Sequence, residues 1–193
     1  MKYQLRLSTA IGVLGLGAVG PAYAAGGGPP ITTSVEPMIG YEHVDKSYPS
    51  PHSVNQLYYG VRASAGYYWL ALEGEYTRAN STEAFADLGA SAAELDETIK
   101  LGLRITHRVA PRIDFTVRAG AAAVRTDSVR TLGPTVSEIK TPFAYDPYAG
   151  LSFGMHLDRM FSVNLGVNVI FGDFPKMDSN RYQTDVGLTI RFP

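Results

Sequence analysis

From residue 181 to residue 192, apolar and polar side chains alternate along the chain. One set comprises Tyr182, Thr184, Val186, Leu188, Ile190 and Phe192, and the other comprises Arg181, Gln183, Asp185, Gly187, Thr189 and Arg191. A period of two places these sets on opposite faces of a β-strand. Because one face is apolar and the other charged, the fold must offer such a strand two different environments.

The same alternation recurs along the chain and predicts seven further strands. They cover about Thr33–Val44, Leu57–Tyr68, Leu70–Arg78, Leu95–Arg108, Ile113–Arg125, Phe143–Leu157 and Met160–Gly172. Three connections are tight, and four longer loops are expected at residues 45–56, 79–94, 126–142 and 173–180. An even number of strands with short turns at one end and long loops at the other is typical of membrane barrels. We predict an all-β fold, an eight-stranded antiparallel up-and-down transmembrane β-barrel.

The first 24 residues have the pattern of a secretory signal peptide. Lys2 and Arg6 precede a short apolar run, and Ala22-Tyr23-Ala24 is a small-residue cleavage site. The run covers about nine residues, far fewer than the roughly 20 that a membrane helix needs. The expected organisation is a signal peptide (1–24), a flexible lead-in (25–30) and a barrel domain (31–193).

Composition excludes several classes of protein. The chain has no cysteine, so it has neither a disulfide framework nor a thiolate metal site. Its formal net charge of −1 at pH 7 does not predict nucleic-acid binding. If the exported chain lies in a membrane, it must do so as a closed barrel, since only helices and closed sheets satisfy every backbone group in lipid.

Alternation alone leaves open which face points inward, because a soluble lipocalin-like barrel also alternates. Here the glycines share the charged face: Gly40, Gly60, Gly66, Gly102, Gly120, Gly150, Gly154, Gly166 and Gly187. The interior of an eight-stranded barrel is just wide enough for side chains. Glycines interspersed with long charged residues suit that interior, whereas on a wet outer surface they would only weaken the strands.

The charged face therefore predicts the contents of the lumen. Its members are Glu36, Glu42, Arg62, Glu73, Glu75, Asp96, Lys100, Arg104, Asp114, Arg118, Asp185 and Arg191. They could line a path for ions or solutes, or form a plug of mutually neutralising ion pairs. In so narrow a barrel we favour the plug.

Aromatic residues lie near the strand ends on the apolar face. Tyr41, Tyr59, Tyr76, Tyr145, Phe171 and Tyr182 are predicted to form a girdle at the long-loop rim, and Tyr67, Trp69, Phe161 and Phe192 one at the other rim. Two aromatic belts around an aliphatic band match the two interfaces of a bilayer.

With these strands in place, the chain resembles the small eight-stranded outer-membrane barrels of the OmpA transmembrane-domain and OmpX type. The tail from Val186 to Phe192 resembles their C-terminal signature, and the run Pro147-Tyr-Ala-Gly-Leu-Ser-Phe-Gly154 their late-strand pattern. The resemblance implies residence in the outer membrane of a Gram-negative bacterium. It also implies that the outer-membrane assembly machinery recognises Val186, Leu188, Ile190 and Phe192.

No catalytic, cofactor or metal site is expected. Some small barrels resemble enzymes that modify lipid A or phospholipids, but Ser152 and His156 lie about 13 Å apart along one strand. His43, Asp45 and His52 share a loop at a spacing that does not indicate a metal site.

The expected function is therefore structural, or interaction with other molecules through the long loops. A narrow channel for ions or small solutes and a lipid-modifying enzyme are the alternatives. Arg125, Arg130 and Lys140 near the third long loop could contact lipopolysaccharide phosphates, or could simply be solvated. The sequence names no extracellular partner.

Overall fold

The computed structural model describes residues 31–48, 50–85, 89–173 and 179–192. The predicted signal peptide and lead-in lie outside these residues, as does Pro193. The strands are β1 (Thr32–Lys46), β2 (His52–Gly66), β3 (Leu70–Phe85), β4 (Ala90–Ala110), β5 (Ile113–Leu132), β6 (Thr135–Lys140), β7 (Ala144–His156), β8 (Phe161–Ile170) and β9 (Arg181–Phe192). In the described part of the chain, a search for helices of membrane-spanning length and hydropathy finds none.

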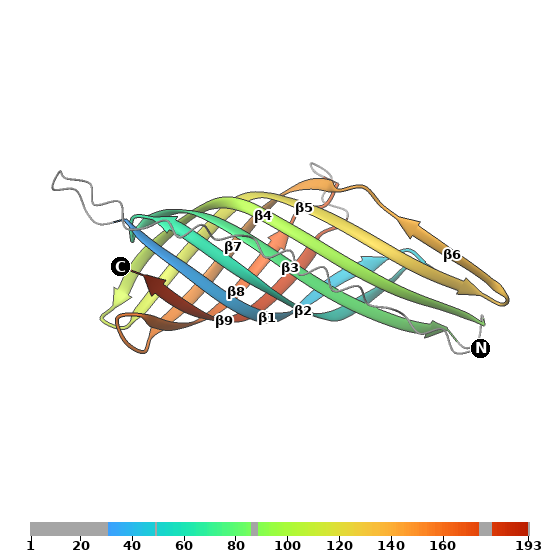
Figure 1. Ribbon diagram of the computed structural model, residues 1–193, viewed down its shortest axis with the longest axis horizontal. Helices are drawn as coiled ribbons and strands as arrows, with labels where there is room; N and C mark the ends of the chain where they lie inside the picture. The colour runs from blue at the N-terminus through green and yellow to red at the C-terminus, as the bar shows by residue number, and fades with distance from the viewer. Residues whose placement is uncertain (1–30, 49, 86–88, 174–178, 193) are drawn as a thin grey trace.

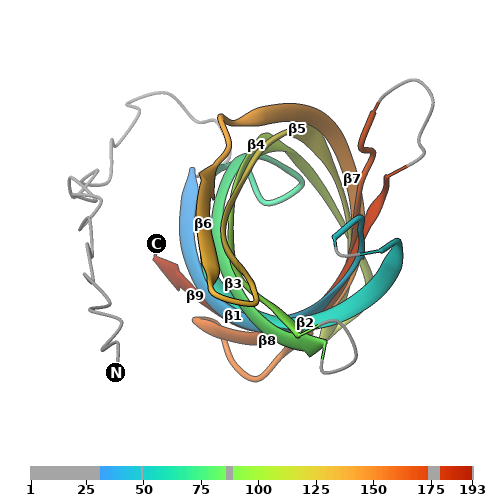
Figure 2. The same ribbon diagram turned by 90° about the vertical axis from the view of Figure 1, so that its right-hand side faces the viewer.

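Eight of the strands close into a ring, seen end-on in Figure 2. Consecutive members pair antiparallel around the ring, and β1 pairs with β9 to close it, so that Thr33 lies opposite Phe192. Closure leaves the ring without an unpaired edge. Strand β6 stands outside the ring and pairs only with the far part of β5.

The side chains are distributed in the opposite way to those of a soluble barrel. Leu101, Leu72 and Leu165 on the outer face are 66%, 63% and 60% exposed, whereas Arg62 and Asp185 on the inner face are 3% and 1% exposed. Water would not stabilise such an apolar outer surface, but hydrocarbon does. The prediction of an eight-stranded transmembrane barrel is confirmed, and a lipocalin-like arrangement is excluded.

The long loops were predicted wrongly in one respect, because most of their described residues form strands. Strand β3 continues to Phe85, and β4 pairs with it from Ala90 onward. Strand β4 has 21 residues, about twice the 9–11 that cross a bilayer. The surplus forms a β-sheet that projects from one end of the barrel, to the right in Figure 1. The segment 45–56 is likewise mostly strand, with β1 ending at Lys46 and β2 beginning at His52.

Strand β6 was not predicted at all. It forms a hairpin with β5, with Leu132 opposite Thr135, and Gly133 at φ 56° makes the tight turn possible. All six of its side chains are exposed. Residues 126–142 are therefore largely a hairpin added to the projecting sheet. Of the fourth predicted loop, 173–180, residues 174–178 lie outside the description.

Two prolines lie inside strands, and only one of them is near a rim. Pro147 lies where the β7–β8 ladder ends, beside the pair Tyr148–Ile170. Pro37 lies well inside β1, opposite Val61. On the side that faces β9, Pro37 has no register partner, because the pairing passes from Val35 directly to Met38. A missing N–H interrupts one ladder there without opening the ring.

Candidate functional site

The lumen holds the residues that the sequence assigned to it. Among the twelve predicted interior charges, Arg104 and Arg191 are half-buried and the others are buried. They come from β1, β2, β3, β4, β5 and β9. Their contacts fall into layers along the barrel axis.

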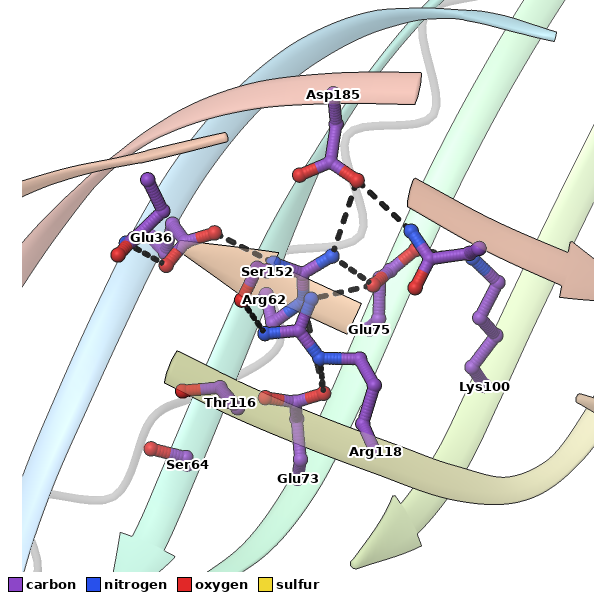
Figure 3. Close-up of polar contacts among 12 residues, drawn as sticks. Glu36, Arg62, Ser64, Glu73, Glu75, Lys100, Thr116, Arg118, Ser152 and Asp185 are labelled. Atoms are coloured by element: carbon purple, nitrogen blue, oxygen red, sulfur yellow. Dashed lines mark hydrogen bonds and ion pairs between the residues drawn. The ribbon is translucent and has the colours of Figure 1, made fainter. Parts of the chain in front are cut away.

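Arg62 on β2 is at the centre of the network (Figure 3). Its Nη1 lies 2.5 Å from Glu36 Oε1, and its Nη2 lies 2.7 Å from Glu75 Oε2. Asp185 and Glu73 approach the same guanidinium at 3.6 and 3.7 Å. Four carboxylates thus surround one positive charge, so further cations are needed nearby.

Lys100 on β4 and Arg118 on β5 supply that charge. Lys100 Nζ lies 2.7 Å from Glu75 Oε1, the oxygen that Arg62 does not contact. Arg118 Nε lies 3.1 Å from Glu73, and its Nη2 donates to Ser152 Oγ at 3.2 Å. Buried charges are tolerated only when they are paired in this way, because the attraction must offset their desolvation.

A second layer lies toward the projecting sheet and is built around a neutral amide. Gln56 Nε2 donates to Glu42 at 2.8 Å and to Asp96 at 2.6 Å. Gln183 Nε2 donates to Glu42 at 3.1 Å. Arg181 lies 3.6 Å from Glu42 and 3.7 Å from Asp96, and supplies the layer's positive charge.

A third layer closes the short-turn end. Asp114 accepts hydrogen bonds from Tyr68 Oη and His156 Nε2, each at 2.5 Å. Arg191 donates to His156 Nδ1 at 2.8 Å and to Ser162 Oγ at 3.0 Å. Both ring nitrogens of His156 are therefore occupied.

The neutral polar residues of these layers were not predicted as site residues. They include Gln56, Gln183, Tyr68, His156 and Ser162. Gln183, His156, Ser162 and Tyr68 have the parity of the inward-facing residues in their predicted strands, so parity could have identified them. Gln56 lies in a segment that was predicted as a loop. Glycine makes the network fit: a Cβ at Gly187 would lie 2.6 Å from Glu36 Oε1.

Space remains at the two ends of the lumen. A cavity of about 50 Å³ beside Arg104 and Thr106 lies toward the short turns. A hollow of about 340 Å³ beside Asp146 and Arg181 lies toward the projecting sheet. At mid-height the largest fully buried side chains, Lys100 and Tyr58 among them, fill the interior.

The predicted girdle residues lie on the outer surface or at its edges. Tyr41, Tyr59, Tyr145, Tyr182, Tyr67, Trp69 and Phe192 are exposed, whereas Tyr76, Phe171 and Phe161 are half-buried. Phe115 and Phe153, which the sequence did not assign to a belt, pack against each other with ring centroids 5.2 Å apart. In the C-terminal signature, Val186, Leu188 and Phe192 are exposed and Ile190 is half-buried.

Arg125 is on the outer face, opposite Glu97 on β4. It donates a hydrogen bond to Glu97, and Tyr76 Oη donates to the same carboxylate at 2.9 Å. The Arg125 guanidinium also lies 5.1 Å from the centroid of the Phe143 ring. Glu97, an acid that strand parity places toward lipid, is therefore neutralised at the rim.

The other two predicted basic residues differ from each other. Arg130 lies opposite Ala92, which is buried on the inner face of the sheet. Its guanidinium is 3.9 Å from Glu94 and 4.4 Å from the ring centroid of Tyr48. Lys140 on β6 is solvent-exposed and lies 3.1 Å from Glu138. Arg130 therefore lies on the opposite face of the sheet from Arg125 and Lys140.

A further polar cluster joins the β1–β2 hairpin to the projecting sheet. Lys46 Nζ lies 2.8 Å from Glu94 and 3.6 Å from Glu83. His52 Nε2 lies 2.8 Å from Glu83, and its Nδ1 lies 2.7 Å from the carbonyl oxygen of Ser50. The Ser50 carbonyl and then Glu83 raise the pKa of His52 above its usual 6.5. The cluster lies in segments predicted as loops, so strand parity does not indicate it.

Three of the four histidines make hydrogen bonds through their ring nitrogens. His43 Nδ1 is 2.8 Å from Asn55 Oδ1, while His52 and His156 have both nitrogens engaged. Within the described ranges, no group of three or more metal-ligating side chains is found.

No protein-family model and no curated protein sequence matches the chain. Among solved structures, it is similar to Ail, the attachment invasion locus protein of Yersinia pestis, with a TM-score of 0.59 at 10% identity over 83% of this chain and 98% of that one. The structure of Ail with the heparin analogue sucrose octasulfate matches at TM-score 0.59 and 11% identity, over 84% and 99% of the two chains. Neisserial surface protein A matches at TM-score 0.56 and 12% identity, over 83% and 97%.

At these identities the similarity shows the fold and nothing finer. The ring of eight strands, the apolar outer band and the charged interior all agree with it. The chain has the fold of the small eight-stranded outer-membrane β-barrels, of which Ail and Neisserial surface protein A are examples.

Proposed function

We propose that this chain is a non-enzymatic outer-membrane protein whose plugged barrel holds a projecting β-sheet for interaction with molecules outside the cell. The observation that carries the proposal is the continuation of β3, β4 and β5 well beyond the length that crosses a bilayer, with β6 added as a fully exposed strand. Rigid scaffolds that present exposed segments commonly serve binding.

The projecting sheet can be tested by removing its outermost hairpin. In the variant, an Asn-Gly turn replaces residues 125–143 and joins β5 to β7 at the pair Val124–Ala144. The barrel should still fold, as heat-modifiable gel mobility would show, while retention on immobilised lipopolysaccharide falls. Unchanged retention of the variant would contradict a binding role for this hairpin.

Lipopolysaccharide is the first partner to test, because Arg125 and Lys140 lie on the outer side of the sheet near the rim. Arginine and lysine both bind phosphate. Arg130 makes a matched control, since it faces Glu94 on the inner side. Replacing Arg125 and Lys140 by Gln should weaken retention, and Arg130→Gln should not. The solved complex of Ail with a heparin analogue makes a sulfated polysaccharide a sensible second probe.

Absence of catalysis is part of the proposal and has two supports. His156 has no free ring nitrogen, and Ser152 Oγ accepts a hydrogen bond from Arg118 instead of facing a base. Mass spectrometry of lipid A and phospholipids from cells with and without the protein tests this directly. A new lipid species that depends on the protein would overturn it.

A narrow channel is the alternative that needs a separate test. The paired charges at mid-height argue against a path, because a permeating ion would have to displace Lys100, Arg62 or their carboxylates. We expect planar-bilayer recordings to show no steady openings. Regular unitary openings would favour transport instead.

The proposed location is the outer membrane of a Gram-negative bacterium, reached after removal of residues 1–24 and through the assembly machinery that reads the C-terminal signature. Cell fractionation and the N-terminal mass of the purified protein test these points. A mature chain that begins at Ala25 is the expected result.

A further inference from the structure

The short-turn end of the barrel carries a basic hollow that the proposed function does not use. It has a volume of about 490 Å³. Four arginines line it: Arg108 from the end of β4, Arg112 from the β4–β5 turn, Arg159 from the β7–β8 turn and Arg191 from β9. Guanidinium groups from three separate parts of the chain therefore meet around one opening.

The two nearby carboxylates are too few to neutralise the four arginines. Asp114, at the inner edge, already accepts from Tyr68 and His156 and is shared by Arg108 at 3.5 Å and Arg191 at 4.0 Å. The other carboxylate belongs to Asp158. Its Oδ1 accepts the backbone N–H groups of Met160 and Phe161, each at 2.7 Å.

Arg112 and Arg159 are exposed, and no carboxylate of the described residues lies within ion-pair distance of either. The opposite end of the molecule is different: Lys46, Arg130 and Arg181 each lie within 4.0 Å of an acid there. Arg112 and Arg159 therefore leave unpaired positive charge at the short-turn end.

Apolar side chains alternate with these arginines in the same turns. Val109 is 54% exposed beside Arg108, and Leu157 and Met160 are 55% and 46% exposed on either side of Arg159. Trp69 lies in a neighbouring turn and stacks on Tyr67, with ring centroids 6.5 Å apart. Apolar and aromatic groups beside arginines suit the level of a leaflet where acyl chains end and phosphates begin.

We propose that this hollow binds the phosphate of an anionic glycerophospholipid from the leaflet around the short turns. The arginines would contact the phosphate oxygens, and Val109, Leu157 and Met160 would contact the first carbons of the acyl chains. A free phosphate would satisfy the arginines but leave those apolar side chains in water. The proposal needs the barrel to lie in a bilayer, but it is independent of the role proposed for the projecting sheet.

Trp69 makes the proposal measurable because it is the chain's single tryptophan and lies at this rim. The full chain would be placed in nanodiscs in which either phosphatidylglycerol or phosphatidylcholine carries bromine, at equal mole fraction. Brominated phosphatidylglycerol should quench Trp69 several-fold more effectively. Arg112→Gln and Arg159→Gln should each lower the preference for phosphatidylglycerol over phosphatidylcholine about fivefold. This corresponds to about 1 kcal/mol per arginine near a charged surface.

The matched control is Arg78→Gln, which removes an arginine from the opposite half of the barrel, where Arg78 lies beside Glu97. It should leave the preference unchanged. Equal quenching by the two lipids would overturn the proposal, as would loss of the preference when millimolar glycerol phosphate is added, because a soluble phosphate would then be the ligand. Absence of quenching by either brominated lipid would contradict the membrane placement itself.

Discussion

Arg62 and Glu36 lie 26 residues apart in the chain and meet at 2.5 Å inside the barrel. Their strands are neighbours in the ring, and the two residues are register partners. The pair is buried, with Glu75 beside Arg62 and the neutral side chains of Asn164 and Thr189 beside Glu36. Neither partner can therefore be hydrated if the other is lost. Stability of the barrel therefore depends on the completeness of this network.

Arg62→Ala should lower the free energy of unfolding by about 3–5 kcal/mol, because it leaves several buried carboxylates without their central cation. Urea titration of the protein in lipid vesicles measures the change. Lys140→Ala is the control: its pair with Glu138 is exposed and should contribute about 0–1 kcal/mol. Equal losses in the two variants would show that the interior network does not stabilise the fold.

Leu103→Arg should cost about 2–4 kcal/mol if Leu103, which is 52% exposed, faces hydrocarbon near the bilayer midplane. Leu132→Arg introduces the same charge at a residue that is 57% exposed on the projecting sheet, and it should have little effect. The same titration compares them. A harmless Leu103→Arg would contradict the orientation of the outer face.

Gly187→Ala should destabilise the barrel by about 1–3 kcal/mol through overpacking. The new Cβ would lie 2.6 Å from Glu36 Oε1, so Glu36 would have to leave its position beside Arg62. At Gly74, nothing lies within 4 Å of an added Cβ. Gly74→Ala should therefore be neutral or stabilising by about 0.5–1 kcal/mol. The prediction fails if the two alanines have the same effect.

The link between His52 and Glu83 should depend on pH. The Ser50 carbonyl and Glu83 raise the pKa of His52 in the folded state, so protonated His52 stabilises this contact. The stabilisation should be complete below pH 6.5 and disappear as the pH rises through the raised pKa. Hydrogen exchange of the β3–β4 hairpin, corrected for intrinsic rates, should show more protection at pH 5 than at pH 8.5. His52→Gln should remove the difference, and a difference that persists in the variant would exclude His52 as its origin.

The membrane-spanning part of the fold could be predicted because lipid on one side and a narrow lumen on the other impose a strict period of two. Residues such as Leu101 and Lys100, adjacent in sequence, differ completely in exposure for this reason. Parity therefore identified the charges that occupy the interior. It could not pair them, since the contact of Lys100 with Glu75 depends on which strands are neighbours and in which register.

The projecting sheet could not be predicted in the same way. Its strands carry Ala, Ser and Glu, as in residues 79–85 and 90–94, without an apolar face. The face of that sheet that is buried carries small residues such as Ala90, Ala92 and Ser128, so the sequence there shows no alternation of apolar and charged residues. Strands β3 and β4 stay paired as far as Phe85 and Ala90, because the hydrogen-bonded register of the barrel continues into the projecting sheet.

The amino-acid sequence by itself determined that the chain forms a closed sheet with charges inside and hydrocarbon outside. The reason is that apolar and polar residues alternate along each strand according to the two environments that its faces meet. Only the tertiary structure decided which charges meet, how far the hairpins extend beyond the bilayer, and that four arginines gather at the short-turn end. Those outcomes depend on strand register and closure of the ring, which bring together residues that no local pattern relates.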